Sequence, residues 1–223
     1  MLEADYIINC AKLKTHGLTV MSAGVKNLFG CIPGLKKPEF HCLKPTIGSF
    51  SDMLVALAQA ISPQITLLDA VDCMEGNGPG GGTVRHMGVT LASRSPHALD
   101  EQAALLMGLR PSMVPVLRAA RECGVLSGNV ELAGDTPVPA DPPFLLPDAI
   151  TGRERLFSAN GIFHRLCGRG RAYPSVLPEK CVGCGRCAES CPMHIIQIRS
   201  QKAVISEKGC ISCFCCQEMC PAH

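Results

Sequence analysis

The chain has 223 residues, of which 47% are hydrophobic, and its formal net charge is +2. This length suffices for one ordinary core with a small appended module, or for two small domains. With no Trp, two Tyr and so small a net charge, the composition lacks the basic surface and the stacking aromatic residues of nucleic-acid-binding proteins. No uncharged apolar run reaches the ~18 residues that span a bilayer, and acidic residues replace the basic region of a signal peptide. We therefore expect a cytoplasmic protein with no transmembrane segment and no nucleic-acid partner.

The first part of the chain alternates predicted strands with predicted helices. Apolar runs with β-branched residues predict buried strands at residues 5–9, 65–71 and 87–93, and a last short strand at 129–134. Helical periodicity predicts helices at residues 51–61, 95–108 and 112–124. Ser51 or Asp52 is the expected N-cap of the first of these helices, and Ser95 that of the second. This alternation predicts an α/β fold, with layers built on a mainly parallel sheet.

Cationic residues follow the first predicted strand. Lys12, Lys14 and His16 lie in the stretch KLKTHG, and Lys26 and Asn27 lie in GVKNLFG. Small anionic ligands usually bind at the carboxyl end of a strand in an α/β sheet, and lysines there are suited to hold them. The alternative is a lysine-rich loop that is simply solvated.

The stretch MEGNGPGGGT, residues 74–83, is a long glycine-rich loop after a predicted strand. It is not a Walker A loop, because no Lys follows Gly82 and a strand is expected next. Its glycines permit close approach of the backbone to a ligand, with Glu75 or Asn77 in contact, although a plain flexible turn has the same composition. Asp100 is either the partner of a cation at the same site or an ordinary acid in the first turn of a helix.

Residues 135–147 contain five prolines, which exclude a helix or a central strand, so this stretch is expected to be an extended linker. The following stretch, residues 151–174, has five arginines against one glutamate. Either its apolar residues pack on the first domain and its basic face is solvated, or it docks an acidic redox partner or a membrane surface. The apolar residues in question are Leu156, Phe157, Ile162, Phe163 and Leu166.

The chain has 15 cysteines, nine of them in the last 43 residues. A disulfide framework usually accompanies a small, loop-rich secreted fold, whereas the first 130 residues here are aliphatic with helical periodicity. The clustered thiols are therefore predicted to be metal ligands, and the scattered ones mostly small buried hydrophobic residues. The scattered cysteines are Cys10, Cys31, Cys42, Cys73, Cys123 and Cys167.

The clustered cysteines repeat one motif, C-x2-C-x2-C-x3-C-P, at residues 181–192 and 210–221. In this spacing a short loop places three thiolates around a cubane, and the fourth cysteine crosses to the other cluster. The crossover gives one 4Fe-4S cluster on Cys181, Cys184, Cys187 and Cys220, and a second on Cys191, Cys210, Cys213 and Cys216. Cys215 aligns with the spacer Arg186, so it is expected to point away from the iron. The alternative, a pair of zinc knuckles, does not require a fourth cysteine followed by Pro.

Between the two motifs, residues 195–198 and 203–205 are apolar runs separated by a polar turn, which predicts a hairpin that covers the clusters. The whole pattern, residues 178–221, resembles the bacterial two-cluster ferredoxin. The resemblance implies a small C-terminal α+β ferredoxin-like domain at 178–223 that carries electrons. Few charges lie near the clusters apart from Arg186 and Lys208, and this permits a low reduction potential.

The stretches NCAKLKTHGLTVMSAGVKNLFGCIPG, LLDAVDCMEGNGPGGG and LASRSPHALDEQAALLMGL resemble the domain of unknown function 362 (DUF362) family. Its members are bacterial and archaeal proteins that often carry a C-terminal ferredoxin module and often have a cysteine at the position of Cys215. The resemblance implies an α/β domain at residues 1–134, followed by the linker and basic docking segment at 135–177. It also implies that the family's polar positions form one pocket. These positions are Lys12, Lys14, His16, Lys26, Asn27, Glu75, Asn77 and Asp100.

Family members usually have more sequence before their first strand than this chain has. We therefore expect a domain that is incomplete at its N-terminus, or a sheet whose missing strands a partner supplies.

Three functions agree with these expectations. In the first, an iron–sulfur oxidoreductase exchanges electrons with a small anionic substrate, with His16 as acid or base beside Lys14 and with lysines holding the anion. In the second, the clusters serve a non-catalytic adaptor that docks a redox partner protein. In the third, the clusters stabilise the C-terminus and report the oxygen or iron status.

Overall fold

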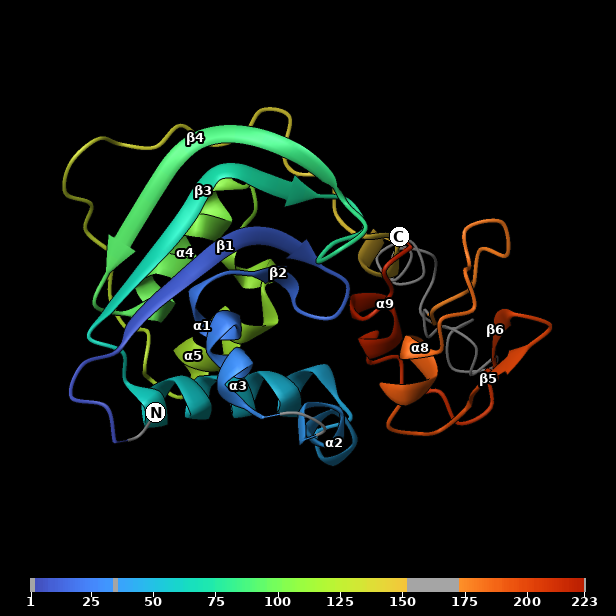
Figure 1. The fold of residues 1–223 in the computed structure, drawn as a ribbon. Helices are drawn as coiled ribbons and strands as arrows, with labels where there is room; N and C mark the ends of the chain where they lie inside the picture. The colour runs from blue at the N-terminus through green and yellow to red at the C-terminus, as the bar shows by residue number, and fades with distance from the viewer. Residues whose placement is uncertain (1–2, 34–35, 152–172, 223) are drawn as a thin grey trace, which may run out of the picture.

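The computed structural model describes residues 3–33, 36–151 and 173–222. They form a larger α/β unit, up to residue 151, and a smaller C-terminal unit from residue 173 that lies beside one end of the sheet (Figure 1). The predicted docking residues Leu156, Phe157, Ile162, Phe163 and Leu166, and also Cys167, lie outside the described residues.

The sheet of the α/β unit has four strands in the order β2 (Val20–Ser22), β1 (Ile8–His16), β3 (Ile65–Glu75) and β4 (Thr83–Ser93). Only β1 and β3 are parallel, whereas β2 pairs with β1, and β4 with β3, in the antiparallel sense. The sheet is therefore mixed, and the expectation of a mainly parallel sheet is wrong. The reason is the short connections: residues 17–19 and 76–82 are too few for a crossover, so each returns the chain antiparallel.

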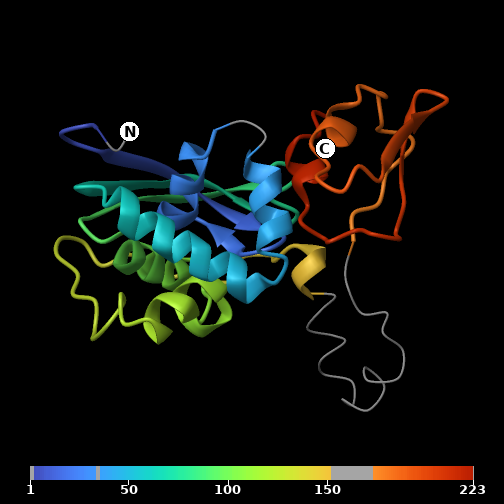
Figure 2. The ribbon, with the colours of Figure 1, turned by 90° about the horizontal axis from the view of Figure 1, so that it is seen from below.

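The helices of the α/β unit lie on one face of the sheet (Figures 1 and 2). The chain between β1 and β3 contains α1 (Gly24–Asn27), the 3-10 helix η1 (Leu28–Cys31), α2 (Lys36–Leu43) and α3 (Ile47–Ile61). After β4 come α4 (Pro96–Leu106), the 3-10 helix η2 (Pro111–Met113) and α5 (Pro115–Glu122). Alternate residues of β1 are buried, as expected for a strand with one covered face. The core between the layers includes Leu13, Leu68, Phe50, Leu54 and Leu117.

The predicted N-cap of α4 is confirmed, whereas that of α3 is wrong. The Ser95 hydroxyl accepts a hydrogen bond from the backbone N–H of Ala98, so α4 begins where predicted. Helix α3 begins earlier, because the Thr46 side chain accepts from the N–H of Ser49. Ser51 lies inside this helix and donates to the carbonyl of Ile47.

The proline-rich stretch runs along the α/β unit rather than free of it. The backbone N–H groups of Ala140 and Phe144 donate to the carbonyls of Leu106 and Met107, which cap the end of α4. Arg85 of β4 covers the Phe144 ring, with its guanidinium carbon 4.9 Å from the ring centroid. Residues 129–134, predicted as a strand, are irregular in the structure.

The C-terminal unit contains α8 (Arg186–Glu189), β5 (Ile196–Arg199), β6 (Lys202–Ile205) and α9 (Cys215–Glu218). The hairpin of β5 and β6 is as predicted, with Ile196 opposite Ile205. Its two-residue turn, Ser200 and Gln201, has φ values of 47° and 57°, which match the twist of the strands. Ile196 is buried against the cysteine loops.

The scattered cysteines are more exposed than expected. Of those in the described chain, Cys73 is buried, Cys31 and Cys42 are half-buried, and Cys10 and Cys123 are exposed. Within the same residues, no helix has the length and apolar composition needed to cross a membrane.

Candidate functional site

Two cavities in and beside the C-terminal unit are lined by cysteines. The larger, of about 520 Å³, is lined by Cys181, Cys184, Cys187 and Cys220, and Cys216 reaches it as well. The smaller is lined by Cys191, Cys210, Cys213 and Cys216. Each of the two four-cysteine sets expected from the motif thus lies around one cavity. We call these the cluster 1 set and the cluster 2 set.

The two cysteine loops have the same backbone conformation. Two residues after the first cysteine of each motif, Gly183 and Ser212 have φ values of 66° and 54°, and two residues later Gly185 and Phe214 have φ values of 80° and 60°. Helices α8 and α9 begin directly afterwards. The sequence repeat is therefore also a structural repeat. Phe214 adopts this left-handed conformation while its side chain is buried.

The first loop is held against the hairpin. An ideal Cβ at Gly183 would lie 2.4 Å from the carbonyl oxygen of Gln201, so this contact requires glycine. The N–H of Ala203 donates to the Cys181 sulfur at 3.4 Å, and hydrogen bonds from Ala203 and Gly183 lower the pKa of Cys181. In the second loop, the N–H of Ser212 donates to the Cys210 sulfur at 3.4 Å. N–H groups directed at sulfur favour the thiolate form that binds iron.

Cys215 is buried and lines neither cavity. A hydrogen bond to Cys213 and burial raise its pKa, which keeps Cys215 a neutral thiol. The same hydrogen bond lowers the pKa of Cys213 to about 7. Cys215 therefore supports a member of the cluster 2 set as a hydrogen-bond donor, a role that its alignment with Arg186 did not indicate.

The donor set fits cubane clusters. Five thiols line the larger cavity and four the smaller one, with Cys216 in both, and the walls of the smaller cavity are otherwise apolar, which excludes water. These walls comprise Pro174, Pro192, Met193, Ile195, Ile196, Ile205, Ile211 and Phe214. Among residues 3–33, 36–151 and 173–222, no group of three or more His, Cys, Asp or Glu side chains is suited to hold a single metal ion.

Helix α9 connects the cysteine loops to the α/β unit. Its Glu218 carboxylate lies 2.7 Å from Nε2 of His16, at the end of β1, and 3.9 Å from Nζ of Lys26 on α1. One residue earlier, Gln217 donates to the carbonyl of Asn77 in the glycine-rich loop at 3.3 Å. Because α9 contains Cys216 of one set and ends two residues before Cys220 of the other, these contacts position both cysteine sets relative to the sheet.

The tautomer of His16 follows from its neighbours. The N–H groups of Leu18 and Thr19 donate to its Nδ1 at 3.0 and 3.3 Å, so Nε2 carries the hydrogen and donates to Glu218. The His16 side chain is fully buried, and burial together with Lys26 lowers its pKa to about 4. Burial acts to raise the pKa of Glu218, but Lys26 and His16 outweigh it and lower that pKa to about 2. At neutral pH the pair is a neutral imidazole bound to a carboxylate.

His41 lies next to this pair. It stacks on Phe50 with the ring centroids 4.4 Å apart, and burial lowers its pKa to about 4. Nearby, the Cys42 sulfur lies 3.8 Å from the sulfur of Met193 in the C-terminal unit. At the junction of the two units, the neutral rings of His16 and His41 therefore lie near the Glu218 carboxylate.

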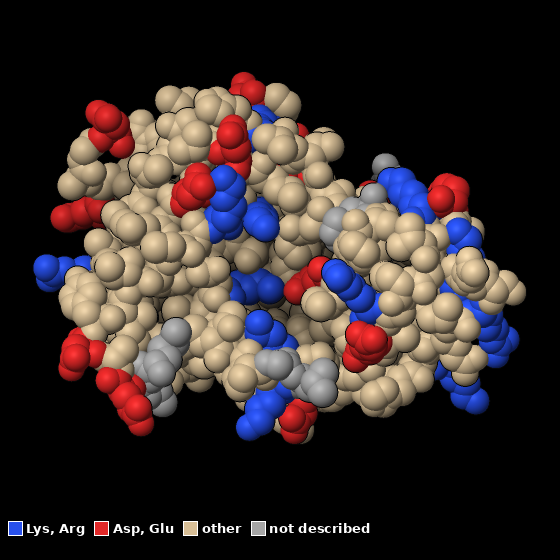
Figure 3. Space-filling view, viewed as in Figure 1, with Lys and Arg blue, Asp and Glu red and all other residues tan. Residues whose placement is uncertain are grey.

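The other lysines expected at the site lie apart from Glu218. Lys12 forms a 2.7 Å ion pair with Asp69 on the exposed face of the sheet. Lys14 is half-buried on β1 and has no ion pair within the part of the chain that the structure describes. Asn27 donates to the side chain of Asn9 and to the carbonyl of Cys10, at 2.8 and 2.9 Å. On the face shown in Figure 3, Lys and Arg side chains gather around a hollow between the two units.

The acidic and amide residues expected at the site also have their own partners. Glu75 pairs with Arg85 at 3.0 Å, and Asn77 exchanges two hydrogen bonds of 2.9 Å with Asp148. Asp100 is buried and accepts from the N–H groups of Gly24 and Val25 instead of pairing with a cation. Burial raises the pKa of Asp100 to about 7, against these two hydrogen bonds.

Of the eight polar positions, the structure thus brings His16 and Lys26 together, and it does so around Glu218. Sequence reasoning missed Glu218 because it lies inside a metal-binding motif, where spacing draws attention to the cysteines. Glu189 occupies the same position in the first motif and is exposed, so the motif itself distinguishes neither glutamate.

The comparisons with known proteins agree with this two-part organisation. Residues 1–105 match the family model described as a domain of unknown function, DUF362, and residues 173–221 match that of a 4Fe-4S dicluster domain. The thylakoid-associated protein sll1697 of Synechocystis sp. is 39% identical over 132 residues, which are 59% of this chain and 41% of that protein. The chain therefore spans about two fifths of the length of this curated relative. No solved structure matches. The N-terminal part of the chain is thus similar to DUF362 domains, and its C-terminal part to 4Fe-4S dicluster domains.

Proposed function

We propose that the protein is an electron carrier that binds two 4Fe-4S clusters, one on each four-cysteine set. The observation that carries this proposal is the separation of the eight motif cysteines into two cavities, each lined by one complete set. Each cluster supplies a centre that takes or gives one electron. The chain holds the clusters through its thiolates, directs N–H groups at Cys181 and Cys210, and excludes water with apolar walls.

We further propose that the α/β unit receives a small anionic substrate, or an acidic partner, at the hollow between the units. Lys14 supports this assignment because no carboxylate pairs with it among the described residues. Lys26 lies at the same end of the sheet. Its Nζ is 3.9 Å from the Glu218 carboxylate, so Glu218 neutralises the charge of Lys26 only in part. Lys12 and Asn27, on β1 and α1, are the further residues proposed to bind the anion.

Within this proposal His16 acts through Glu218 rather than on the substrate. A general acid or base must reach the reacting group, and the His16 ring is fully buried with both nitrogens engaged. The acid–base role expected from the sequence is therefore less well supported than a positioning role. We propose that Glu75, Asn77 and Asp100 stabilise the loops of the α/β unit through their own hydrogen bonds and do not contact the anionic substrate.

The alternative is a cluster-bearing adaptor without a substrate of its own. The name of the relative, a thylakoid-associated protein, favours this alternative in that it describes association and no reaction. The cytoplasmic compartment expected from the sequence stays a prediction, which fractionation of cells into soluble and membrane material tests.

Anaerobic reconstitution followed by a reductive titration in the EPR spectrometer tests the electron-carrier proposal. We expect about eight irons per chain and two one-electron reduction steps. Clusters that bind but cannot be reduced reversibly would leave only a structural or sensing role. For the anion site, Lys14→Ala should weaken binding of a small dicarboxylate, and Arg118→Ala, which removes a positive charge from the exposed side of α5, is the matched control. Equal binding by both variants would exclude the Lys14 site without affecting the electron-carrier proposal.

A further inference from the structure

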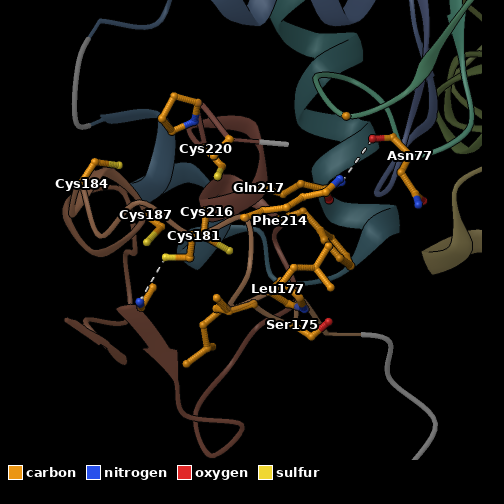
Figure 4. A pocket seen from close by; sticks show the side chains of 18 of the residues that line it. Asn77, Ser175, Leu177, Cys181, Cys184, Cys187, Phe214, Cys216, Gln217 and Cys220 are labelled. Carbon is orange, nitrogen blue, oxygen red and sulfur yellow. Dashed lines mark hydrogen bonds between the residues drawn. The ribbon is translucent and has the colours of Figure 1, made fainter. Parts of the chain in front are cut away.

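The larger cavity extends beyond the cluster 1 set. Its other end is formed by the α/β unit, through Gly17 after β1, Asn77 and Gly81 of the glycine-rich loop, and Asp148 and Ala149. In Figure 4, Phe214, Gln217 and Leu177 lie between the thiols and the Asn77 loop. The whole cavity, including the space between the cluster 1 thiols, has a volume of about 520 Å³, within the range of about 300–1,000 Å³ that small-molecule sites have. The cavity therefore joins the cluster 1 set to a second, thiol-free compartment.

This second compartment is held in shape by its own contacts. Asn77 binds Asp148 through both its amide oxygen and its amide nitrogen. An ideal Cβ at Gly78 would lie 2.3 Å from the carbonyl oxygen of Thr15, so the loop passes closer to β1 than any other residue type permits. Gln217 ties α9 to the same loop. A wall fixed in this way loses little entropy when a ligand binds.

The compartment is suited to an uncharged, flat molecule. Its larger side chains next to the α/β unit include the apolar Pro147, Leu177 and Phe214, while the same cavity is also lined by Tyr173 and by Lys180, which precedes Cys181 in the sequence. Asp148, the acidic residue of the lining, already accepts a hydrogen bond from Asn77. Asn77 and Gln217 each use one amide hydrogen in the contacts above, and the second amide hydrogen of each side chain can donate to a carbonyl or hydroxyl of a ligand.

We propose that this compartment binds a quinone-type molecule that exchanges electrons with the cluster on Cys181, Cys184, Cys187 and Cys220. This site rests on the proposed function, because the electrons come from the bound clusters. The reduction balances with two electrons and two protons for each quinone that becomes a hydroquinone. Each of the two reduced clusters gives up one electron and is oxidised, and water at the cavity mouth supplies the protons. The lysine hollow is a separate site for anions.

The test uses the reconstituted holoprotein with both clusters oxidised, so that the probe, menadione, binds without reacting. Equilibrium dialysis should show saturable binding of one menadione per chain, and the EPR signal of the reduced cluster 1 should shift when menadiol is present. Ala149→Phe fills the compartment from the α/β side, at a residue outside both cysteine motifs, and should weaken menadione binding about tenfold or more. Ala92→Phe places the same side chain on the exposed face of β4 and should bind as wild type does.

Iron content and the EPR spectrum without menadione separate the possible failures. Full iron content with no saturable menadione binding, or with equal binding in both variants, overturns the quinone site and leaves the electron carrier standing. Low iron in the wild-type protein contradicts the electron carrier itself. If Ala149→Phe alone loses iron, Gly17→Ala takes its place, because its added Cβ meets Ala149 and Phe214 at only 3.8 Å and still narrows the compartment. Unchanged binding in Gly17→Ala then counts against the site.

Discussion

Buried histidines make this protein sensitive to acid at the level of single residues. His97 is the simplest case, because its buried Nε2 has no hydrogen-bond partner in the described structure and burial alone lowers its pKa to about 4. In the unfolded chain the same ring titrates near 6.5. At pH values between these two pKa values, the His97 ring is therefore protonated in the unfolded chain and neutral in the folded protein. Stability is complete above about pH 6.5 and declines as the pH falls toward 4.

We expect His97→Gln to flatten this decline. Each such histidine contributes a slope of at most about 1.4 kcal/mol per pH unit within that window. Anaerobic urea unfolding at pH 7.5 and pH 5.5, followed by circular dichroism, measures the difference. His86→Gln is the matched control, because His86 is exposed on β4 beside Asp72. The same pH dependence in wild type, control and His97→Gln would contradict the assignment.

At the scale of single residues, the sequence showed the intervals between the cysteines but not the burial or the partners of individual side chains. The eight motif cysteines follow from their intervals, because a cubane constrains where its ligands lie along the chain. The burial of His16 and the partner of Asp100 depend on segments distant in sequence, so no local pattern contains them. For Cys215, the spacing predicts that it is not a ligand, whereas its influence on the pKa of Cys213 depends on the folded loop.

At the scale of elements, the contact between the first cysteine loop and the hairpin of β5 and β6 places the strictest requirement on residue type, because it needs glycine at position 183. Gly183 combines a φ of 66° with a backbone contact that an added Cβ would bring to 2.4 Å. We expect Gly183→Ala to displace the loop and to reduce the iron bound by the cluster 1 set. Iron analysis and EPR measure this loss.

Gly128→Ala is the control for the backbone conformation alone. Its φ is 73° and an added Cβ would meet nothing within 4 Å, so it carries only the conformational cost of about 1 kcal/mol. Equal iron content in the two variants would show that the contact with Gln201 does not matter.

Local chemistry predicted some elements well and others poorly. The β5–β6 hairpin and the start of α4 follow from short-range signals, an apolar–polar–apolar pattern and a serine cap. The short strand β2 gives no such signal, because three residues carry no periodicity. The direction of β4 depends on the length of the glycine-rich connection before it. The prediction of a mainly parallel sheet used only the alternation of strands and helices and did not consider that length.

At the scale of the whole molecule, the Glu218 contact joins the two units. Removing its charge should weaken the junction, because His16 and Lys26 would each lose a charged partner. We expect Glu218→Gln to cost about 1–3 kcal/mol of junction stability. Hydrogen–deuterium exchange should become faster in residues 212–219 and at the end of β1.

Glu189→Gln makes the same change at the equivalent position of the first motif, where the side chain is exposed, and should leave exchange unaltered. Faster exchange in both variants would indicate a general effect on the cysteine loops instead of a specific junction. The sequence could not predict this junction, since it depends on how two separately recognisable domains meet.

In the proposed arrangement of the clusters, the two motifs exchange their fourth cysteines and Cys215 binds no iron. Iron and sulfide analysis of anaerobically reconstituted Cys215→Ser and Cys220→Ser tests it most directly. We predict about eight irons per chain for the wild type and for Cys215→Ser. Cys220→Ser should lose or degrade the cluster held mainly by the first motif, on Cys181, Cys184 and Cys187. Loss of a cluster in Cys215→Ser with both clusters intact in Cys220→Ser would contradict the account.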